Sequence, residues 1–364
     1  MSLDLEEIID KQLASMNLES IDQLTDLIGK DKIFSDMTPG QIIKGIINGD
    51  PLFNFNNIIS NILNLFMSEI YGSIVLGVQL VIICIIIGLL KNLSTSFGDD
   101  TVSKLGTVVC SCSVMALCLK SFMEVYTICM NAVDTMSVTM QALLPVLVPL
   151  LISMGNFTSG SILNPVIVTA ITIFNSALQR IVMPAVLLSS IFILVNSLSD
   201  RDYVKKLALF MRAFAIFMVG LCVTLFSGLT AIQGIVTKTA DGMIAKTARY
   251  SMDNFIPIVG GFAADSIDLV LSCATIIKNG IGLFGLFIII TLLILPLIKI
   301  LAIALVYKIT AIIIEPIGNK TVSDCLNEMG NSVITLAVII FLAATMFIIF
   351  LAVIIGIGGG NLWR

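Results

Sequence analysis

Long apolar stretches, each with at most one charged residue and separated by more polar segments, run through most of this chain. They lie at 70–90, 105–123, 181–199, 207–230, 279–306 and within 329–363. A helix of about 20 apolar residues crosses the hydrocarbon core of a bilayer. Because backbone groups in lipid must be hydrogen-bonded internally, each stretch is expected to be helical. The pattern predicts an all-α, polytopic membrane protein with about six to eight transmembrane helices.

The first 69 residues have a different pattern. Leu5, Ile8, Ile9 and Leu13 follow helical spacing with acidic residues between them, and the segment carries 11 acidic and 4 basic residues. We expect a small region of short amphipathic helices outside the membrane, at 1–69, followed by a polytopic helical membrane domain at 70–364. No signal-peptide pattern is visible before the first predicted span.

Two connectors, 124–180 and 228–280, separate three pairs of predicted spans. The first contains 45 consecutive uncharged residues, 135–179, interrupted by Pro145, Pro149 and Pro165. This stretch is either two ordinary spans, at 138–154 and 162–179, or a re-entrant helical hairpin. The second connector is too polar for two spans, which favours a hairpin there.

Paired prolines suggest that the two connectors belong to an internal repeat. Pro145 and Pro257 are 112 residues apart, and so are Pro184 and Pro296. Repeats of this weak kind are common in membrane transporters. The offset predicts that Pro145 and Pro257 occupy equivalent places in related connectors, and that Pro184 and Pro296 do so in related helices.

The distribution of lysine and arginine predicts the orientation. Cytoplasmic loops of membrane proteins are enriched in these residues. Their density is highest in 91–104, 199–206 and 307–328. We therefore expect these three loops in the cytoplasm and both chain ends outside.

Composition narrows the function. Hydrophobic residues make up 57% of the chain and charged residues 12%, and there is no histidine. The commonest general base and metal ligand are thus missing, and no basic stripe suggests nucleic-acid binding. The eight cysteines lie mostly in apolar runs and suit packing. No enzyme activity, catalytic residue, cofactor or metal site is predicted.

Ionisable residues inside predicted spans are the candidate functional residues. Arg180 and Lys299 are the best placed, and Lys299 follows Pro296 by three residues. A proline frees a backbone carbonyl that a lysine can bind. Alternatively the lysine reaches the membrane surface along its flexible stem. If the ammonium is buried, we expect a carbonyl or carboxylate partner, with Asp265 and Asp268 nearest in sequence.

Several strings in the second half of the chain resemble the stage III sporulation protein AE family. They are NFIPIVG at 254–260, IKNGIGL at 277–283, PLIKILA at 296–302, ALVYK at 304–308 and EPIG at 315–318. The resemblance covers about 70–364. Members of this family usually begin with a signal peptide, so the first residues depart from its pattern.

The resemblance implies a multi-pass protein of the mother-cell membrane that engulfs the forespore. Such proteins belong to a secretion-like channel, or feeding tube, on which late forespore gene expression depends. Their partners are other products of the same operon, including an ATPase and ring-forming subunits, and a forespore protein. Whether this chain conducts a substrate or only acts as a scaffold stays open, as does assembly into a homo-oligomer. A secondary transporter for a small substrate is the alternative function.

Overall fold

The computed structural model describes residues 55–97, 100–154, 157–197, 204–255, 260–317 and 320–356. Throughout these ranges the chain is helical, with no strand, which confirms the predicted all-α class. The predicted amphipathic region at 1–69 lies mostly outside them.

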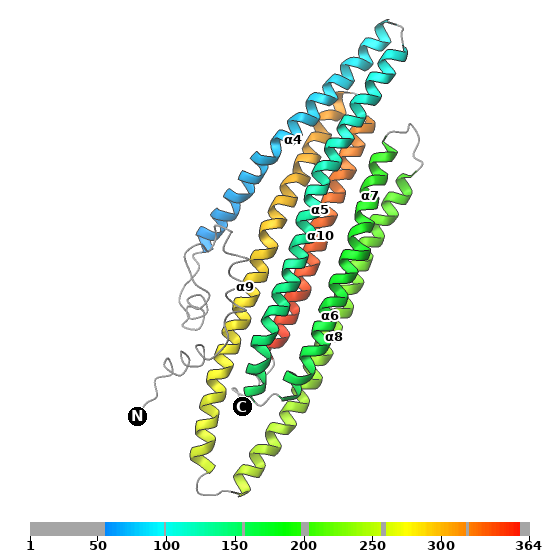
Figure 1. Ribbon diagram of the computed structural model, residues 1–364. Helices are drawn as coiled ribbons and strands as arrows, with labels where there is room; N and C mark the ends of the chain where they lie inside the picture. Colours follow the sequence, from blue (N-terminus) through cyan, green and yellow to red (C-terminus); the bar gives the residue numbers. More distant parts are fainter. Residues whose placement is uncertain are drawn as a thin grey trace.

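The described part of the chain contains seven α-helices and two short helical segments (Figure 1). The helices are α4 (Phe55–Phe97), α5 (Asp100–Ser153), α6 (Phe157–Ala177), α7 (Met183–Asn196), α8 (Lys205–Phe255), α9 (Gly260–Ile314) and α10 (Lys320–Gly356). A π-helical segment, Leu178–Val182, joins α6 to α7 in one rod, and a 3-10 turn, Glu315–Ile317, follows α9. The chain therefore folds into six long rods.

Each rod contains a stretch that is long and apolar enough to cross a membrane. These stretches are Ile62–Leu89, Val108–Ser153, Pro165–Asn196, Lys205–Val236, Ala274–Ile314 and Lys320–Gly356. The count of six lies within the predicted range and establishes a multi-pass architecture.

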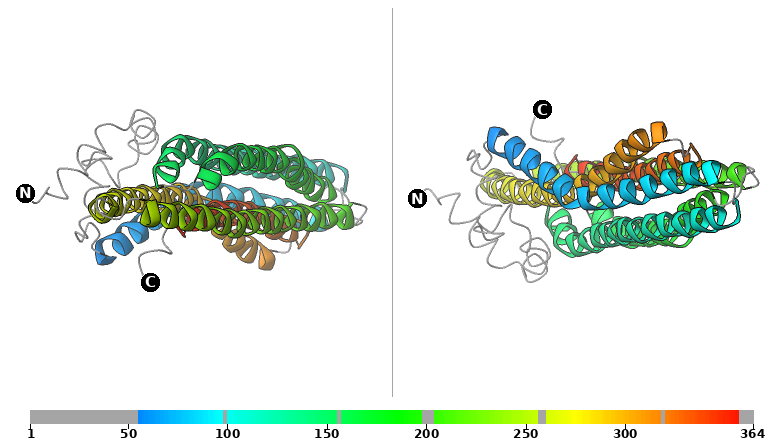
Figure 2. Two further views of the ribbon diagram at one scale, coloured as in Figure 1. Left: turned by 90° about the horizontal axis from the view of Figure 1, so that it is seen from below. Right: turned by 90° about the horizontal axis from the view of Figure 1, so that it is seen from above.

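Successive rods run in opposite directions, so their joins alternate between two ends of the bundle (Figure 1). The last turns of α4, α7 and α9 lie at one end, and the last turns of α5 and α8 at the other. The three loops predicted to share one side of the membrane thus share one end, which we call the three-loop end. The end views in Figure 2 show the rods running alongside one another, with the first turns of α4 leaving the bundle.

The predicted breaks at Pro145, Pro149 and Pro165 are wrong, because α5 continues through the first two to Ser153 and Pro165 lies inside α6. A proline removes one backbone hydrogen bond, but membrane helices tolerate the loss when neighbours hold the helix in place. The two proline rings of α5 are exposed, whereas Leu143, Leu144 and Leu147 beside them are buried. The strained side of the helix therefore faces outward while its apolar side stays packed.

This continuity changes the picture of the first connector. Residues 138–154 are the lower part of α5, and 162–179 belong to the rod that continues into α7. They are extensions of the predicted spans 105–123 and 181–199 rather than two additional spans. The second connector has the same plan, with α8 running to Phe255 and α9 starting at Gly260. Each connector therefore consists of the ends of two antiparallel helices, and in the first of them α5 packs against α6.

The proline repeat is only partly placed. Pro257 lies outside the described residues, so its equivalence with Pro145 stays a prediction. Pro184 and Pro296 both lie on rods that run toward the three-loop end. Pro184 opens α7 directly after the π segment, whereas Pro296 lies inside an uninterrupted α9.

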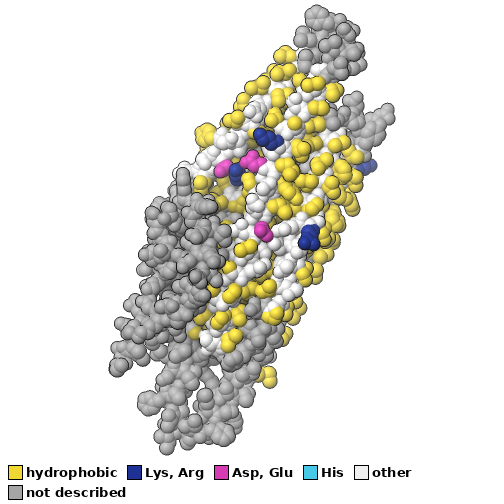
Figure 3. All heavy atoms as spheres, in the orientation of Figure 1, with side chains coloured by type: hydrophobic (Ala, Val, Ile, Leu, Met, Phe, Trp, Pro, Cys, Tyr) yellow, Lys and Arg dark blue, Asp and Glu magenta, His cyan; other side chains and the backbone are white. Residues whose placement is uncertain are grey.

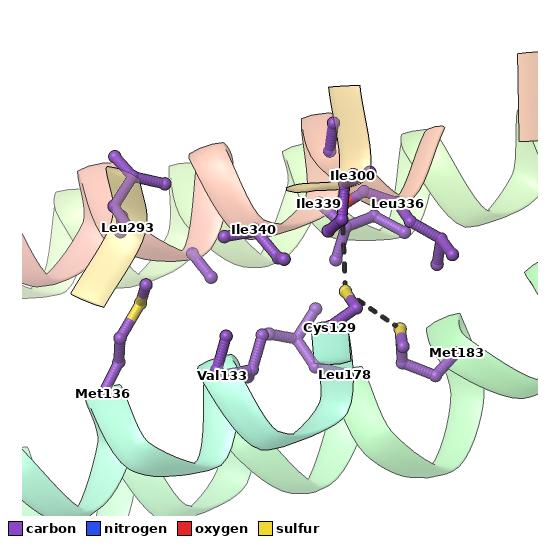
Figure 4. Close-up of a cluster of buried hydrophobic side chains, with 14 of the residues drawn as sticks. Cys129, Val133, Met136, Leu178, Met183, Leu293, Ile300, Leu336, Ile339 and Ile340 are labelled. Carbon is purple, nitrogen blue, oxygen red and sulfur yellow. Dashed lines mark hydrogen bonds between the residues drawn. The ribbon is translucent and has the colours of Figure 1, made fainter. Parts of the chain in front are cut away.

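The last helix, α10, lies at the centre of the packing. It contacts α5, α7, α8 and α9, and its buried positions recur around the helix. In the core, the Cys129 thiol donates to the sulfur of Met183 at 3.8 Å and to the carbonyl of Leu336 at 3.7 Å (Figure 4). The described cysteines are unpaired thiols, of which Cys84, Cys118, Cys129 and Cys325 are buried and Cys112 is exposed.

Close contacts of α9 with α10 and α5, away from the three-loop end, depend on glycine. A Cβ on Gly282 would lie 2.5 Å from Ile355 Cγ1, and one on Gly285 would lie 2.6 Å from Leu143 Cδ1. Small residues of this kind let membrane helices approach closely where apolar burial alone gives little driving force.

Candidate functional site: a polar face at membrane depth

One face of α5 is exposed and polar along the middle of its membrane-spanning stretch. The positions on this face recur every three or four residues, which places them in one line on the helix. Its polar members, which we call the α5 polar stripe, are Lys120, Glu124, Thr127, Asn131, Asp134 and Gln141, and all are exposed. Val138 completes the line with 48% of its surface exposed. The opposite side of α5, including Val125, Cys129 and Val133, is buried against the other helices.

Part of the stripe lies within the membrane whichever section of α5 crosses the bilayer. At about 1.5 Å per residue, Lys120 to Gln141 spans about 32 Å, close to the thickness of the hydrocarbon core. The spanning stretch is Val108–Ser153. Any window of about 20 residues within it that begins at or before residue 124 contains Glu124, and any later window contains Asp134. A carboxylate therefore lies at membrane depth in every placement.

Lys299, the leading candidate from sequence, joins this face. Its Nζ lies 3.4 Å from Oε1 of Glu124, and the two side chains are 37% and 59% exposed. The predicted carboxylate partner therefore exists, but the residue is Glu124 of α5, not Asp265 or Asp268. Since α9 is one continuous helix through Pro296, those two aspartates lie about 45–50 Å from Lys299 along its axis.

A second polar group on this face joins α5 to α6. The amides of Asn175 and Gln179 donate to Oδ1 of Asp134 at 3.3 and 3.1 Å, and Gln179 also contacts Oδ1 of Asn175 at 3.2 Å. Asp134 directly precedes the uncharged run 135–179, so a search for charged residues inside apolar runs does not select it. The regular spacing of polar residues along 120–141 is the signal that identifies it.

Arg180, the other charged candidate, lies next to this group. It is exposed and belongs to the π segment, one residue after Gln179. The segment shows the wider π hydrogen bond, because the N–H of Met183 donates to the carbonyl of Leu178 five residues earlier. Pro184 has no N–H to give to the carbonyl of Arg180, four residues before it, which accounts for the irregularity at this position. Such π segments often occur at functional sites.

The outward faces of α4 and α8 differ sharply from this one. On α8 the exposed large side chains from Leu207 to Val236 are apolar, and no exposed position between them is charged. On α4, from Tyr71 to Leu89, the exposed positions are also uncharged, and Gln79 is the large polar side chain among them. Figure 3 shows charged side chains standing among hydrophobic ones on one face of the bundle. Lipid suits α4 and α8, whereas an aspartate at the centre of a lipid-facing helix costs about 2.5–3.5 kcal/mol.

Two further charged groups stabilise the bundle internally. Near the three-loop end, Nη2 of Arg212 lies 2.8 Å from Oε2 of Glu328, linking α8 to α10. Beside them, Lys308 of α9 donates to the side-chain oxygens of Asn327 and Asn331 at 2.6 and 2.5 Å. These contacts tie three helices together.

At the other end, the ammonium of Lys278 donates to the carbonyl of Ile355 at 3.0 Å, and the lysine is fully buried. This carbonyl belongs to the last turn of α10, where backbone oxygens lack partners within the helix and favour a positive charge. Lys278 therefore acts as a cap for α10, a role that the sequence alone did not suggest.

The chemistry available at the polar face is that of ion pairing and hydrogen bonding. Among the described residues there is no group of three or more cysteine or acidic side chains placed to hold a metal ion. The face offers ammonium, guanidinium, carboxylate and amide groups along a line at membrane depth. Such groups in membrane proteins mark water-filled paths or contacts between helices.

Comparison with known proteins identifies relatives across most of the chain. Residues 37–358 match the family described as stage III sporulation protein AE. A protein of Bacillus subtilis (strain 168) named stage III sporulation protein AE is 32% identical over 335 residues, which cover 92% of this chain and 79% of the relative. No solved structure matches.

Proposed function

Since this chain belongs to the stage III sporulation protein AE family, we propose that it is a non-enzymatic membrane subunit of the channel complex that links mother cell and forespore. The family match carries the proposal, because it covers nearly all of the described helices rather than one motif. The chain is thereby a sporulation protein with a multi-pass fold.

The location and the partners are part of this proposal. The protein lies in the mother-cell membrane around the engulfed forespore. It assembles there with the ATPase and ring-forming products of the same operon and with a forespore partner. Its six apolar rods suit a membrane component that holds such an assembly in place.

The polar face gives this role a structural basis. A protein that only anchored others in lipid would be apolar on all outward faces, as α4 and α8 are. The α5 polar stripe instead presents both signs of charge at membrane depth. The sequence contains no histidine, which is the commonest general base of enzymes.

Gene deletion in the native spore-forming host tests the proposal. We expect forespores to be engulfed but late forespore gene expression and heat-resistant spores to be lost, with both restored by an intact copy. A fluorescent fusion should mark the engulfing membrane. Normal late expression and spore yield in the deletion strain would overturn the assigned role.

A secondary transporter is the second candidate, and the ionisable residues at membrane depth are the observation that favours it. A transporter works without the other subunits. Purified protein in liposomes should then take up a small substrate along an ion gradient, and Lys299→Met should abolish the uptake. In the channel-subunit role, the reconstituted protein alone shows no such uptake.

A further inference from the structure

The polar face of α5 and α6 needs an occupant other than lipid. Glu124, Asp134 and Arg180 are exposed at the level of the membrane-spanning stretches, on neighbouring rods. Charged groups at this depth face other protein or water rather than hydrocarbon. From Tyr71 to Leu89 on α4 and from Leu207 to Val236 on α8, by contrast, no exposed side chain is charged, so lipid can cover these sides of the bundle.

The spacing of the stripe suits packing against another helix. From Lys120 to Gln141 there are six steps over 21 residues, an average of 3.5 residues for each step. Positions that repeat every 3.5 residues form a continuous seam between helices that wind around each other. The face is thus regular over a length that matches the whole bilayer core, as an extended interface requires.

The charges on this face are complementary to a second copy of the same face. Asp134 lies at the same depth as Asn175 and Gln179, since both amides donate to it. Arg180 follows Gln179 directly, so a carboxylate and an exposed guanidinium lie at one level on neighbouring rods. In a two-fold dimer whose axis is the membrane normal, the two copies sit at one depth and the same face of each copy meets the other, level by level.

We propose that the α5 polar stripe and Arg180 form an interface with a second copy of this chain, in which Asp134 of one copy faces Arg180 of the other. This inference names a partner for the proposed membrane subunit and rests on that role for its membrane setting. The Lys299–Glu124 pair lies on the same face and supplies a second level of mixed charge.

Cysteine cross-linking in native membranes tests the interface. The background replaces all eight cysteines with alanine and is first checked for normal accumulation. Asn131→Cys places a thiol on the stripe, and Leu225→Cys places a matched thiol on the apolar face of α8, where the native side chain is 65% exposed. With an oxidant, we expect Asn131→Cys to give a disulfide-linked species of twice the chain mass and Leu225→Cys to stay monomeric.

Charge exchange tests the named contact. Two differently tagged copies are co-expressed, and their co-purification is measured. Asp134→Arg and Arg180→Asp should each reduce it at least severalfold, and the double variant Asp134→Arg/Arg180→Asp should restore it. Each single variant must still accumulate in the membrane. If one of them does not, the interface is tested by the cross-linking of Asn131→Cys alone.

Three outcomes overturn the proposal. Asn131→Cys that forms no dimer but reacts with a water-soluble maleimide shows a face open to water. Asn131→Cys that does neither shows a face covered by lipid or by a different protein. A double variant that co-purifies no better than the single variants removes the Asp134–Arg180 contact. The proposed function is separable, because the deletion strain can fail to sporulate in any of these cases, and dimers can form in a strain that sporulates normally.

Discussion

Glu124 of α5 and Lys299 of α9 form an ion pair across two helices, with 3.4 Å between the carboxylate oxygen and the ammonium. Neither side chain is buried, so the pair stands on an open face of the bundle rather than in its core. Both residues lie inside stretches that are apolar enough to cross a membrane. The pair therefore joins opposite charges where isolated charges are unfavourable.

Removing one member of this pair should affect function more than folding. In Lys299→Met the long stem is kept and the charge is lost, which leaves Glu124 without its cation. We expect the protein to accumulate normally and spore yield to fall about tenfold or more, since unpaired charges at membrane depth disturb the contacts of that face. Immunoblotting and counts of heat-resistant spores measure the two effects.

Two control variants sharpen this test. Lys299→Arg keeps the cation and should sporulate normally. Glu124→Gln/Lys299→Met removes both charges and should recover part of the yield. If Lys299→Met sporulates at the native level, the charge has no required role, and the family assignment is unaffected.

The contact between Gly282 and Ile355 should tolerate no added methyl group. Gly282→Ala places a Cβ 2.5 Å from Cγ1 of Ile355, so α9 and α10 must shift apart. We expect a loss of about 1–3 kcal/mol in stability. The thermal midpoint of the detergent-solubilised protein reports the change.

Gly220 provides the matched control on α8. An added Cβ there meets nothing within 4 Å, and alanine forms helices better than glycine. Gly220→Ala should be neutral or slightly stabilising. Gly282→Ala/Ile355→Ala should regain part of the lost stability, because the second substitution removes the atom in contact. Equal thermal midpoints for Gly282→Ala and Gly220→Ala would contradict the packing argument.

Arg212 and Glu328 should depend on each other. Their side chains are 15% and 23% exposed, so either charge alone is poorly solvated. We expect Arg212→Met to destabilise the bundle by about 3 kcal/mol, the typical cost of leaving one member of a buried pair. Arg212→Met/Glu328→Met should be less destabilised than the sum of the single variants, and a thermal double-mutant cycle measures the coupling. Additive single effects would show that the pair contributes nothing specific.

The shared end of the three positive loops predicts a labelling pattern. Ser103→Cys and Lys206→Cys, in a cysteine-free background, should be protected from an impermeant thiol reagent in intact cells and react after permeabilisation, since these loops are expected in the cytoplasm. Ser153→Cys, at the other end of α5, should react from outside. Reaction of the first two sites in intact cells would reverse the predicted orientation.

Sequence reasoning succeeded where one physical constraint dominates. Backbone groups in lipid must be hydrogen-bonded internally, so each long apolar run forms a helix. The predicted span 70–90 lies within α4, and 207–230 lies within α8. It failed where two opposing effects have similar size. A proline weakens a helix, but packing on the other side of Pro145 and Pro149 holds α5 together, and a residue pattern alone does not weigh one against the other.

The candidate site shows the same division. Lys299 and Arg180 were found from sequence because charges inside apolar runs stand out. The residues around them were not predicted, because those depend on which rods are neighbours and on how far each rod is shifted along the other. Glu124 lies 175 positions before Lys299 in the chain, and only the antiparallel path of α5 and α9 brings them to one level.

The lengths of α5 and α9 have a mechanical consequence. They contain 54 and 55 residues, and at about 1.5 Å per residue each is about 80 Å long. The hydrocarbon core accounts for about 30 Å of that length. The apolar stretches themselves, Val108–Ser153 and Ala274–Ile314, have 46 and 41 residues and also exceed that thickness. A helix longer than the core must tilt or extend past it, and because α5 and α9 pack against the same neighbours, a tilt of one carries the others with it.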